Sequence, residues 1–509
     1  MKKLLLFASL CFLFTTVANA QQTTFSKVIN DGPLQVVGYS VIKCFDNNYM
    51  LAGIDEGAAL VLKLDTSGNI IWKKTIGNNN GGVFTGIIPT KDSDYVLAGS
   101  IFNTVNSSND FLCVKINSAG DTLWTKEIDM GYNDYALSVQ QTYDNGYILA
   151  GYAGQNSPVT SKIAVVKLDS SGNLLWGKKF TGGNFDNCAY SIRQTPDSGY
   201  MMLGYTDSLS NYDTRTILMK ITSDGNIVWT KKDHSAYYST GYDMALTANG
   251  IACYLVSSMY NIILKTDFAG NVAWCKTYGG NGNYYNSPAP KIHPASDSGF
   301  VFLSDMSLQK IDSAGNPVWS KSWMCISTTD VVESGDKGYL ILLNGPLMVT
   351  KSPIVTWGEI ALIKTDSSGN CATCFMGNST HTPTTYPINF IPVSFTTVTG
   401  AANIISHPVV AAASLNERSG CVDVIGGMNE SETNENAIAI YPDPTYDHLS
   451  VECSSPSTIE ILNIRGQLLK IIPTGETKTI LDVSFLTCGV YIVEVKTEKG
   501  IKIKKFVKE

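Results

Sequence analysis

One short motif recurs seven times along the chain and constrains its fold more than any other feature. Each copy ends an apolar run with a turn that most often reads D-x-x-G-N, and the turn glycines stand 45 to 54 residues apart. They are Gly68, Gly120, Gly172, Gly225, Gly270, Gly315 and Gly369. A repeat of this length is one supersecondary unit that cannot bury its faces alone. Successive copies must therefore pack against one another.

Each copy contains four strand-like pieces. In the copy whose turn glycine is Gly225, AYSIRQT (189–195) precedes a turn at 196–199, and GYMMLGYT follows it. A longer loop, the run TRTILMKIT, the turn at 223–225 and the run NIVWTKK complete the unit. These runs are rich in β-branched and aromatic residues and are bounded by Gly, Asp, Asn and Ser, which is typical of strands. Seven such units predict an all-β chain with a seven-bladed β-propeller at residues 21–375, followed by a small C-terminal β-sandwich.

A tryptophan stands four residues after the turn glycine in six of the seven copies. These residues are Trp72, Trp124, Trp176, Trp229, Trp274 and Trp319, and the seventh copy has Thr373 instead. Because the ring recurs once per unit, we interpret it as packing between neighbouring sheets rather than as part of a ligand cage. Loss of one such ring from a core typically costs about 3 to 5 kcal/mol.

The start of the mature chain matches the strand that the seventh copy lacks. Phe25 to Ile29 (FSKVI) follows the pattern of Trp72 to Ile76 (WKKTI), with Phe25 in the tryptophan position. We therefore predict that residues 24–29 form the outermost strand of the seventh blade. This pairing would join the two ends of the ring and hide its open edges.

The recurrent turn aspartates have a structural explanation. The carboxylate can accept backbone N–H groups of the turn, and the glycine supplies a positive φ. A calcium loop is the alternative, but each turn holds a single Asp, and Asn117 or Thr222 replaces it in two copies. That leaves too few oxygen ligands for Ca²⁺. We expect no metal site and no cofactor.

The complete repeat is similar to a known family. The runs Leu168 to Gly182 and Asp197 to Gly204 show the pattern best, and it resembles the bacterial seven-bladed β-propeller repeat over about residues 22–375. This resemblance implies a fold and carries no catalytic residues. The blades are also similar to those of quinoprotein dehydrogenases, which carry adjacent cysteines, whereas this chain offers Cys371-x-x-Cys374 outside the ring.

The two flanking segments have different characters. Residues 1–20 are typical of a secretory signal peptide, with Lys2 and Lys3 before an apolar run and Ala18-Asn19-Ala20 as the cleavage site. No later stretch is long and apolar enough for a transmembrane segment. Residues 376–436 are expected to form extra strands on the propeller and then a linker.

The cysteines around that linker suggest a covalent tie. In an exported chain, a disulfide from Cys421 to either Cys371 or Cys374 is the favoured interpretation. Zinc is the alternative, and it would need His381 or His407 as a fourth ligand.

Residues 437–509 consist of short strands with Lys-rich ends and predict the small antiparallel sandwich. The segment resembles the C-terminal sorting domain of the type IX secretion system of Bacteroidota. The residues that carry the resemblance are Tyr441, Pro442, Pro444, Gly466, Gly489 and Tyr491. Two positions depart from the pattern, Asp443 in place of Asn and Cys488 in place of a small residue or proline. The resemblance implies the type IX machinery as a partner, passage through the outer membrane, and a secreted or cell-surface product.

Signs of catalytic chemistry are sparse. The chain has five histidines, and no H-E-x-x-H, G-x-S-x-G or Gly-rich phosphate loop occurs. Its net charge of −7 leaves no basic surplus for nucleic acid. We expect a non-catalytic module that binds an extracellular glycan or protein. The alternative is an extracellular polysaccharide hydrolase or lyase, which a convergent Asp/Glu pair near the centre of the ring would favour.

The loops indicate which face would bind. In a propeller the short a–b and c–d hairpins share one face, and the b–c loops and d–a crossings share the other. The second set varies in length and is rich in Tyr, Asn and Asp. The candidate ligand-binding residues are Tyr132, Asp134, Asp186, Tyr205, Asp207, Tyr212, Asp213, Tyr242 and Asp243. Tyrosine offers flat apolar area with a polar tip, and neighbouring carboxylates can bond hydroxyl groups.

Overall fold

The computed structural model describes two units separately, Met1–Ile425 and Gly426–Glu509. In the first unit it describes residues 24–30, 36–76, 81–105, 107–154, 161–182, 186–208, 213–235, 238–257, 259–279, 290–304, 307–322, 327–344, 359–371 and short segments between 377 and 419. In the second it describes 439–442, 444–452, 457–463, 468–474, 476–487, 489–497 and 500–508. Several sequence predictions lie outside these residues: the signal peptide, the linker at the end of residues 376–436, Tyr212, Cys374, Cys421 and Gly466.

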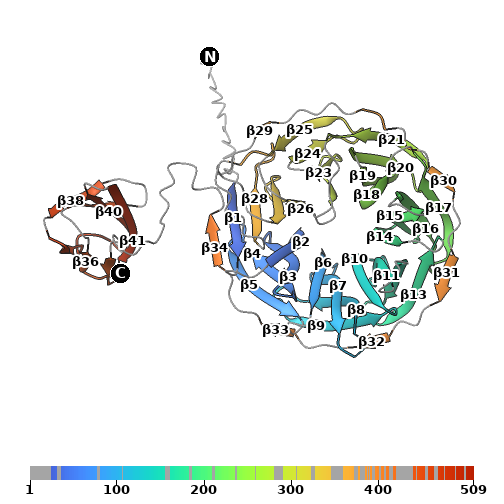
Figure 1. The fold of residues 1–509 in the computed structure, drawn as a ribbon, viewed down its shortest axis with the longest axis horizontal. Coiled ribbons are helices and arrows are strands. Elements are labelled where there is room, and N and C mark those ends of the chain that lie inside the picture. The colour runs from blue at the N-terminus through green and yellow to red at the C-terminus, as the bar shows by residue number, and fades with distance from the viewer. Residues whose placement is uncertain are drawn as a thin grey trace, which may run out of the picture. The chain divides into compact units, whose positions relative to one another are not determined.

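Seven four-stranded antiparallel blades make up the first unit, as the repeat predicts. Blade 1 is β2 (Val36–Lys43), β3 (Tyr49–Asp55), β4 (Ala58–Leu64) and β5 (Ile70–Ile76). Blade 2 is β6 (Gly82–Pro89), β7 (Tyr95–Asn103), β8 (Ser108–Ile116) and β9 (Thr122–Asp129). Blade 3 is β10 (Asn133–Gln141), β11 (Tyr147–Gly154), β12 (Lys162–Leu168) and β13 (Leu174–Thr181). Blades 4 and 5 are β14 (Asn187–Gln194), β15 (Tyr200–Ser208), β16 (Asp213–Ile221) and β17 (Ile227–Asp233); and β18 (Ser239–Thr247), β19 (Gly250–Ser257), β20 (Asn261–Thr266) and β21 (Val272–Thr277). Blade 6 is β22 (Ile292–Pro294), β23 (Phe300–Ser304), β24 (Ser307–Ile311) and β25 (Pro317–Ser322). The first strand of each blade stands nearest the ring axis (Figure 1).

The seventh blade takes its outer strand from the start of the chain. It combines β26 (Ser327–Glu333), β27 (Tyr339–Asn344) and β28 (Ile360–Lys364) with β1 (Phe25–Asn30). Strand β1 pairs antiparallel with β28, from Phe25 opposite Lys364 to Ile29 opposite Ile360. The predicted closure of the ring is therefore confirmed.

The tryptophan rings lie against turn glycines of the next blade. A Cβ built on Gly120 would come within 2.8 Å of the Trp72 ring of the preceding blade, so only glycine leaves room for that ring. The turn also holds Gly120 at φ +79°, a backbone conformation that glycine adopts readily. The same contact joins Trp124 to Gly172, Trp176 to Gly225, Trp229 to Gly270, Trp274 to Gly315 and Trp319 to Gly369. Phe25 makes the equivalent contact with Gly68, which completes the circle.

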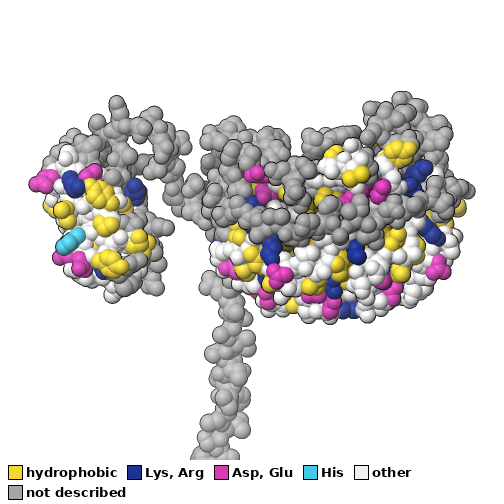
Figure 2. All heavy atoms as spheres, turned by 90° about the horizontal axis from the view of Figure 1, so that it is seen from below, with side chains coloured by type: hydrophobic (Ala, Val, Ile, Leu, Met, Phe, Trp, Pro, Cys, Tyr) yellow, Lys and Arg dark blue, Asp and Glu magenta, His cyan; other side chains and the backbone are white. Residues whose placement is uncertain are grey.

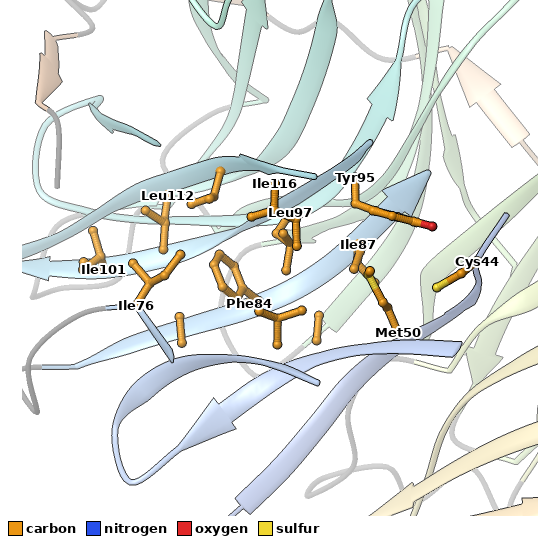
Figure 3. Packing of buried hydrophobic residues seen from close by; sticks show 14 residues of the cluster. Cys44, Met50, Ile76, Phe84, Ile87, Tyr95, Leu97, Ile101, Leu112 and Ile116 are labelled. Carbon is orange, nitrogen blue, oxygen red and sulfur yellow. The ribbon is translucent and has the colours of Figure 1, made fainter. Parts of the chain in front are cut away.

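Apolar side chains of adjacent blades form shared cores. Between blades 1 and 2, Met50 of β3 belongs to the same cluster as Phe84 of β6 and Leu97 of β7, and all three are fully buried (Figure 3). Similar clusters lie between other neighbouring blades. The repeats therefore stabilise one another rather than folding as separate sheets.

The turn aspartates act on the turns themselves. Asp65 Oδ1 accepts the N–H groups of Ser67 and Asn69, each at 2.8 Å, which confirms the structural interpretation. A second aspartate set in the a–b turns pairs with lysines of the third strands, as Asp197 does with Lys220 at 2.7 Å. Further pairs of this kind are Asp46–Lys63, Asp92–Lys115, Asp144–Lys167, Asp297–Lys310 and Asp336–Lys364. On the face that Figure 2 shows, acidic and basic side chains of the larger unit lie close together, in agreement with these pairs.

A late segment of the chain adds a fifth strand to six blades. Strands β29 (Gly377–Asn378), β30 (Phe390–Pro392), β31 (Thr396–Thr399), β32 (Asn403–Ile405), β33 (Val409–Ala411) and β34 (Asn416–Ser419) pair with β25, β17, β13, β9, β5 and β1 in that order. Thr385 bridges Lys276 of the remaining blade. The segment thus runs backward around the ring and covers the outer strand edges (Figure 1).

The second unit consists of two small sheets. One contains β35 (Ala439–Tyr441), β36 (His448–Glu452) and β39 (Lys478–Asp482), and the other contains β37 (Ser457–Asn463), β38 (Leu468–Thr474), β40 (Gly489–Thr497) and β41 (Gly500–Lys508). Leu449 and Leu481 from the first sheet share one buried cluster with Ile459, Val493 and Phe506 from the second. The unit is therefore a β-sandwich, as predicted. Over the residues described, both units contain strands and no helix, so no helix there could cross a membrane.

Candidate functional site

The crossings and b–c loops meet at one end of the blades, as the propeller topology requires. Asp186, in the crossing between β13 and β14, accepts the N–H of Ser161 on its Oδ1 at 2.8 Å. Its backbone carbonyl accepts the N–H of Asp207 at 2.9 Å. The candidates Asp186 and Asp207 therefore lie together, next to the b–c loop of blade 3.

Five half-buried tyrosines gather near this end on blades 3 to 5, and we call them the tyrosine cluster: Tyr135, Tyr152, Tyr190, Tyr205 and Tyr242. The rings of Tyr135 and Tyr152 stack with centroids 5.0 Å apart. Tyr190 lies 6.0 Å from Tyr205 within blade 4 and 4.8 Å from Tyr242 of blade 5. Each ring keeps part of its surface accessible, so the cluster offers aromatic faces to a ligand.

Burial raises the pKa of four of these phenols and keeps them protonated, those of Tyr135, Tyr152, Tyr190 and Tyr205. It is the largest cause that raises the pKa of Tyr190 above its ordinary value, and the neighbouring groups Cys188, Tyr242, Tyr205 and Tyr152 raise it further. The pKa values of Tyr152 and Tyr205 are raised chiefly by burial as well. At neutral pH each hydroxyl can therefore both donate and accept a hydrogen bond.

An ion pair joins the inner strands of blades 4 and 5 next to the cluster. Asp243, only 2% exposed, accepts Arg193 Nη2 at 3.0 Å and Ser191 Oγ at 2.9 Å. Its other oxygen accepts the Ile292 N–H of blade 6 at 3.2 Å. Burial alone would raise the pKa of Asp243, but Arg193 and Lys291 hold it below its ordinary value. This carboxylate is charged and occupied by protein donors.

The same arrangement recurs two blades further on. Asp330 of β26, 2% exposed, lies 2.7 Å from Nε2 of His293 on blade 6, and it accepts the Val41 N–H of blade 1 at 2.9 Å. Both aspartates follow a bulge in their inner strand. Their geometry fastens neighbouring blades together rather than presenting a carboxylate to a ligand.

A cluster of three carboxylates, Asp110 and Asp134 buried and Asp129 half-buried, lies between blades 2 and 3. Asp110, Asp129 and Asp134 each place one oxygen within 4.8 Å of the others. Burial is the main cause that raises the pKa of Asp110 to about 7 and that of Asp134 to about 8. The sequence analysis expected no metal site because the repeat turns offer too few ligands, and it did not consider these three residues together, since they come from three different strands and form no motif.

The remaining candidates separate into surface and interior residues. Tyr132 is 58% exposed in the crossing between β9 and β10. Asp134 and Asp243 are instead buried, because each carboxylate points to backbone or side-chain donors within the blades. Asp213 begins β16 opposite Ser208, and its side chain lies outside the described residues.

Sequence analysis missed Tyr135, Tyr152 and Tyr190. A signal was nevertheless present in the repeat alignment. Tyr190 and Tyr242 occupy the bulged position of their inner strands, between residues that pair regularly with the second strand. Aligning the inner strands on this position would have placed the two rings on neighbouring blades at the same height.

The comparison with protein families decides the nature of the second unit. Residues 439–509 match the family described as the secretion system C-terminal sorting domain. This segment is a type IX sorting domain. It indicates export of the protein to the cell surface or the medium. Within the sorting domain, Tyr491 packs its ring 5.7 Å from Phe506, and Tyr441 bonds Lys478 at 2.5 Å.

Comparison with curated proteins finds no match for this chain. Among solved structures, PorZ of Porphyromonas gingivalis, described as an essential surface component of the type IX secretion system, is 11% identical with a TM-score of 0.39. The alignment covers 91% of this chain and 58% of PorZ. A Bacteroides caccae protein of unknown function is 13% identical with a TM-score of 0.35, and the alignment covers 58% of this chain and 93% of that protein. XC5397, a gluconolactonase from Xanthomonas campestris, is 8% identical with a TM-score of 0.31, and the alignment covers 54% of this chain and 91% of XC5397.

Proposed function

We propose that this exported propeller is a non-catalytic binding module and that its tyrosine cluster holds a polysaccharide. The single observation that carries the proposal is the gathering of five partly accessible tyrosines across three blades. Tyrosine combines a flat apolar face with a hydroxyl that exchanges hydrogen bonds, at low entropic cost. Sugar rings need both contacts, because their faces carry C–H groups and their edges carry hydroxyls.

The half-buried Asp186 and Asp207 support a sugar ligand, because they lie beside Tyr205 at the end of β15. Carboxylate oxygens accept hydrogen bonds from hydroxyl groups. The arrangement resembles the general composition of small-molecule sites, with aromatic walls and a few placed polar groups. The ligand would then contact blades 3, 4 and 5.

The competing function, a polysaccharide hydrolase or lyase, needs a reachable acid or base. The carboxyl groups with raised pKa, Asp110 and Asp134, are 0% exposed, so a substrate could not contact them. The Asp243 carboxylate is bonded to donors within the protein, and its pKa is lowered. These properties suit a structural ion pair and not a general acid, which must carry a proton. These properties favour binding.

The test measures retention of the full chain on immobilised xylan, mannan, cellulose and amylopectin. We expect wild-type protein to bind at least one of these polymers. Tyr190→Ala and Tyr242→Ala should each weaken binding about fivefold, since loss of one aromatic contact is worth about 1 kcal/mol. Tyr190→Phe keeps the ring and should retain most of the affinity.

Tyr143→Ala is the matched control. Tyr143 is 55% exposed in the a–b turn of blade 3, on the opposite face. Its replacement by alanine should therefore leave retention on the polymers unchanged. Melting temperatures of all variants separate lost binding from unfolding. Release of reducing ends from any polymer would support the hydrolase instead, and equal retention of both alanine variants would overturn the site assignment.

A further inference from the structure

Three carboxylates between blades 2 and 3, two of them buried and one half-buried, converge from three strands. Asp110 comes from β8, Asp129 ends β9, and Asp134 comes from β10. One oxygen of each lies within 4.8 Å of the other two. Oxygens on opposite sides of a Ca²⁺ ion lie about 4.6 to 5.2 Å apart, and adjacent ligands lie closer. The three oxygens thus lie within the span that the ligands of one Ca²⁺ ion cover.

A separate observation points to a missing partner in this cluster. The Asp134 side chain is 0% exposed, and its Oδ2 accepts the Met130 N–H at 2.6 Å. Its Oδ1 is enclosed as well, yet it has no hydrogen-bond partner within the part of the chain that the structure describes. A buried carboxylate oxygen without a donor is costly, so such atoms usually have a proton, a donor or a metal ion.

The local charge balance strengthens the argument. Glu127, 1% exposed, is linked to Asp110 through Asn103, whose Nδ2 donates to Asp110 Oδ2 at 2.8 Å and to Glu127 Oε1 at 2.6 Å. Four carboxylates thus lie close together, and three of them, Asp110, Glu127 and Asp134, are buried. Lys179 brings a single positive charge nearby, and its Nζ donates to the Met130 carbonyl at 2.6 Å.

We propose that Asp110, Asp129 and Asp134 form a binding site for a divalent cation, with Ca²⁺ as the ion that fits best. The ligands are all hard oxygen donors, and Ca²⁺ tolerates irregular coordination and all-protein ligands, whereas Mg²⁺ demands near-octahedral geometry and gives up its waters reluctantly. Glu127, second carboxylate oxygens and water would complete the coordination. The ion would fasten β8 and β9 of blade 2 to β10 of blade 3, and it would fix the crossing that carries Tyr132. This inference does not depend on polysaccharide binding.

The test compares the full chain after chelation with the same protein in CaCl2 or MgCl2. Wild-type protein should bind one Ca²⁺ by equilibrium dialysis. Its melting temperature should rise by roughly 4 °C at a Ca²⁺ concentration one hundred times the dissociation constant. Mg²⁺ should give a smaller rise at equal concentration.

Asp134→Asn and Asp110→Asn keep the side-chain shape and remove a negative charge. Both variants should melt at or above the temperature of chelated wild-type protein, and neither should respond to Ca²⁺. Asp186→Asn, in the next crossing, is the control and should keep the full response. A wild-type protein that does not respond to Ca²⁺, or variants that respond as wild type does, would overturn the proposal.

Discussion

The strand that closes the ring provides a quantitative test of the fold argument. Phe25→Ala removes the one aromatic ring that stands in a tryptophan position at the seam between blades 7 and 1. Phe25 is 9% exposed and belongs to the cluster that also contains Leu62 and Leu342. A Cβ on Gly68 would come within 2.6 Å of its ring, so ring and glycine are in close contact.

The expected cost follows from this burial. Truncation of a buried phenylalanine to alanine costs about 3 to 5 kcal/mol. We take the lower end, about 3 kcal/mol, because Phe25 begins its strand and the site can partly collapse. For a cooperative unit of roughly 350 residues, this destabilisation lowers the melting temperature by roughly 4 °C.

Calorimetry of the full chain measures this shift, and two further variants test its cause. Phe25→Trp recreates the contact of the other six seams and should melt close to wild type. Phe45→Ala makes the same chemical change at a side chain that is 57% exposed, and it should cost at most about 1 kcal/mol. If Phe25→Ala melts within 1 °C of Phe45→Ala, the aromatic closure does not stabilise the ring and our reasoning fails.

Three other outcomes are expected. Burial raises the pKa of Asp197 and the Lys220 ion pair lowers it, and the net effect in the folded state is a lowering. This carboxylate therefore stabilises the fold above about pH 4, and the stabilisation is lost as the pH falls further. Urea midpoints measured between pH 3 and pH 7 should show this loss, and a midpoint that does not change with pH would contradict it. Gly120→Ala should lower the free energy of unfolding by about 1 to 2 kcal/mol, because the residue has a positive φ. Gly86→Ala, whose Cβ would lie 3.7 Å from its nearest neighbour, should lower it less in the same urea titration. Equal losses would refute the argument. Deleting residues 437–509 should leave a folded propeller in the periplasm, and undiminished secretion in fractionated cells would disprove the role of the sorting domain.

The number of blades and their turns followed from the sequence because these features depend on neighbouring residues. In each turn the aspartate bonds N–H groups two and four residues later, as Asp65 does with Ser67 and Asn69. Such a turn forms from its own residues and does not depend on the position of its blade in the ring. Phe25 could be assigned to the last blade because its strand repeats the pattern that follows Gly68.

The two sites depended on the tertiary structure. Tyr190 and Tyr242 are 52 residues apart in the chain, yet they touch because bulges on adjacent inner strands turn their rings toward each other. Asp110 and Asp134 meet across a blade boundary, which no local pattern encodes. The sequence by itself determined the repeat, its strands and the sorting domain, since these are set by local turn chemistry and periodicity. Only the folded ring decided which candidate aspartates are buried, because burial depends on what the neighbouring blade places against each side chain.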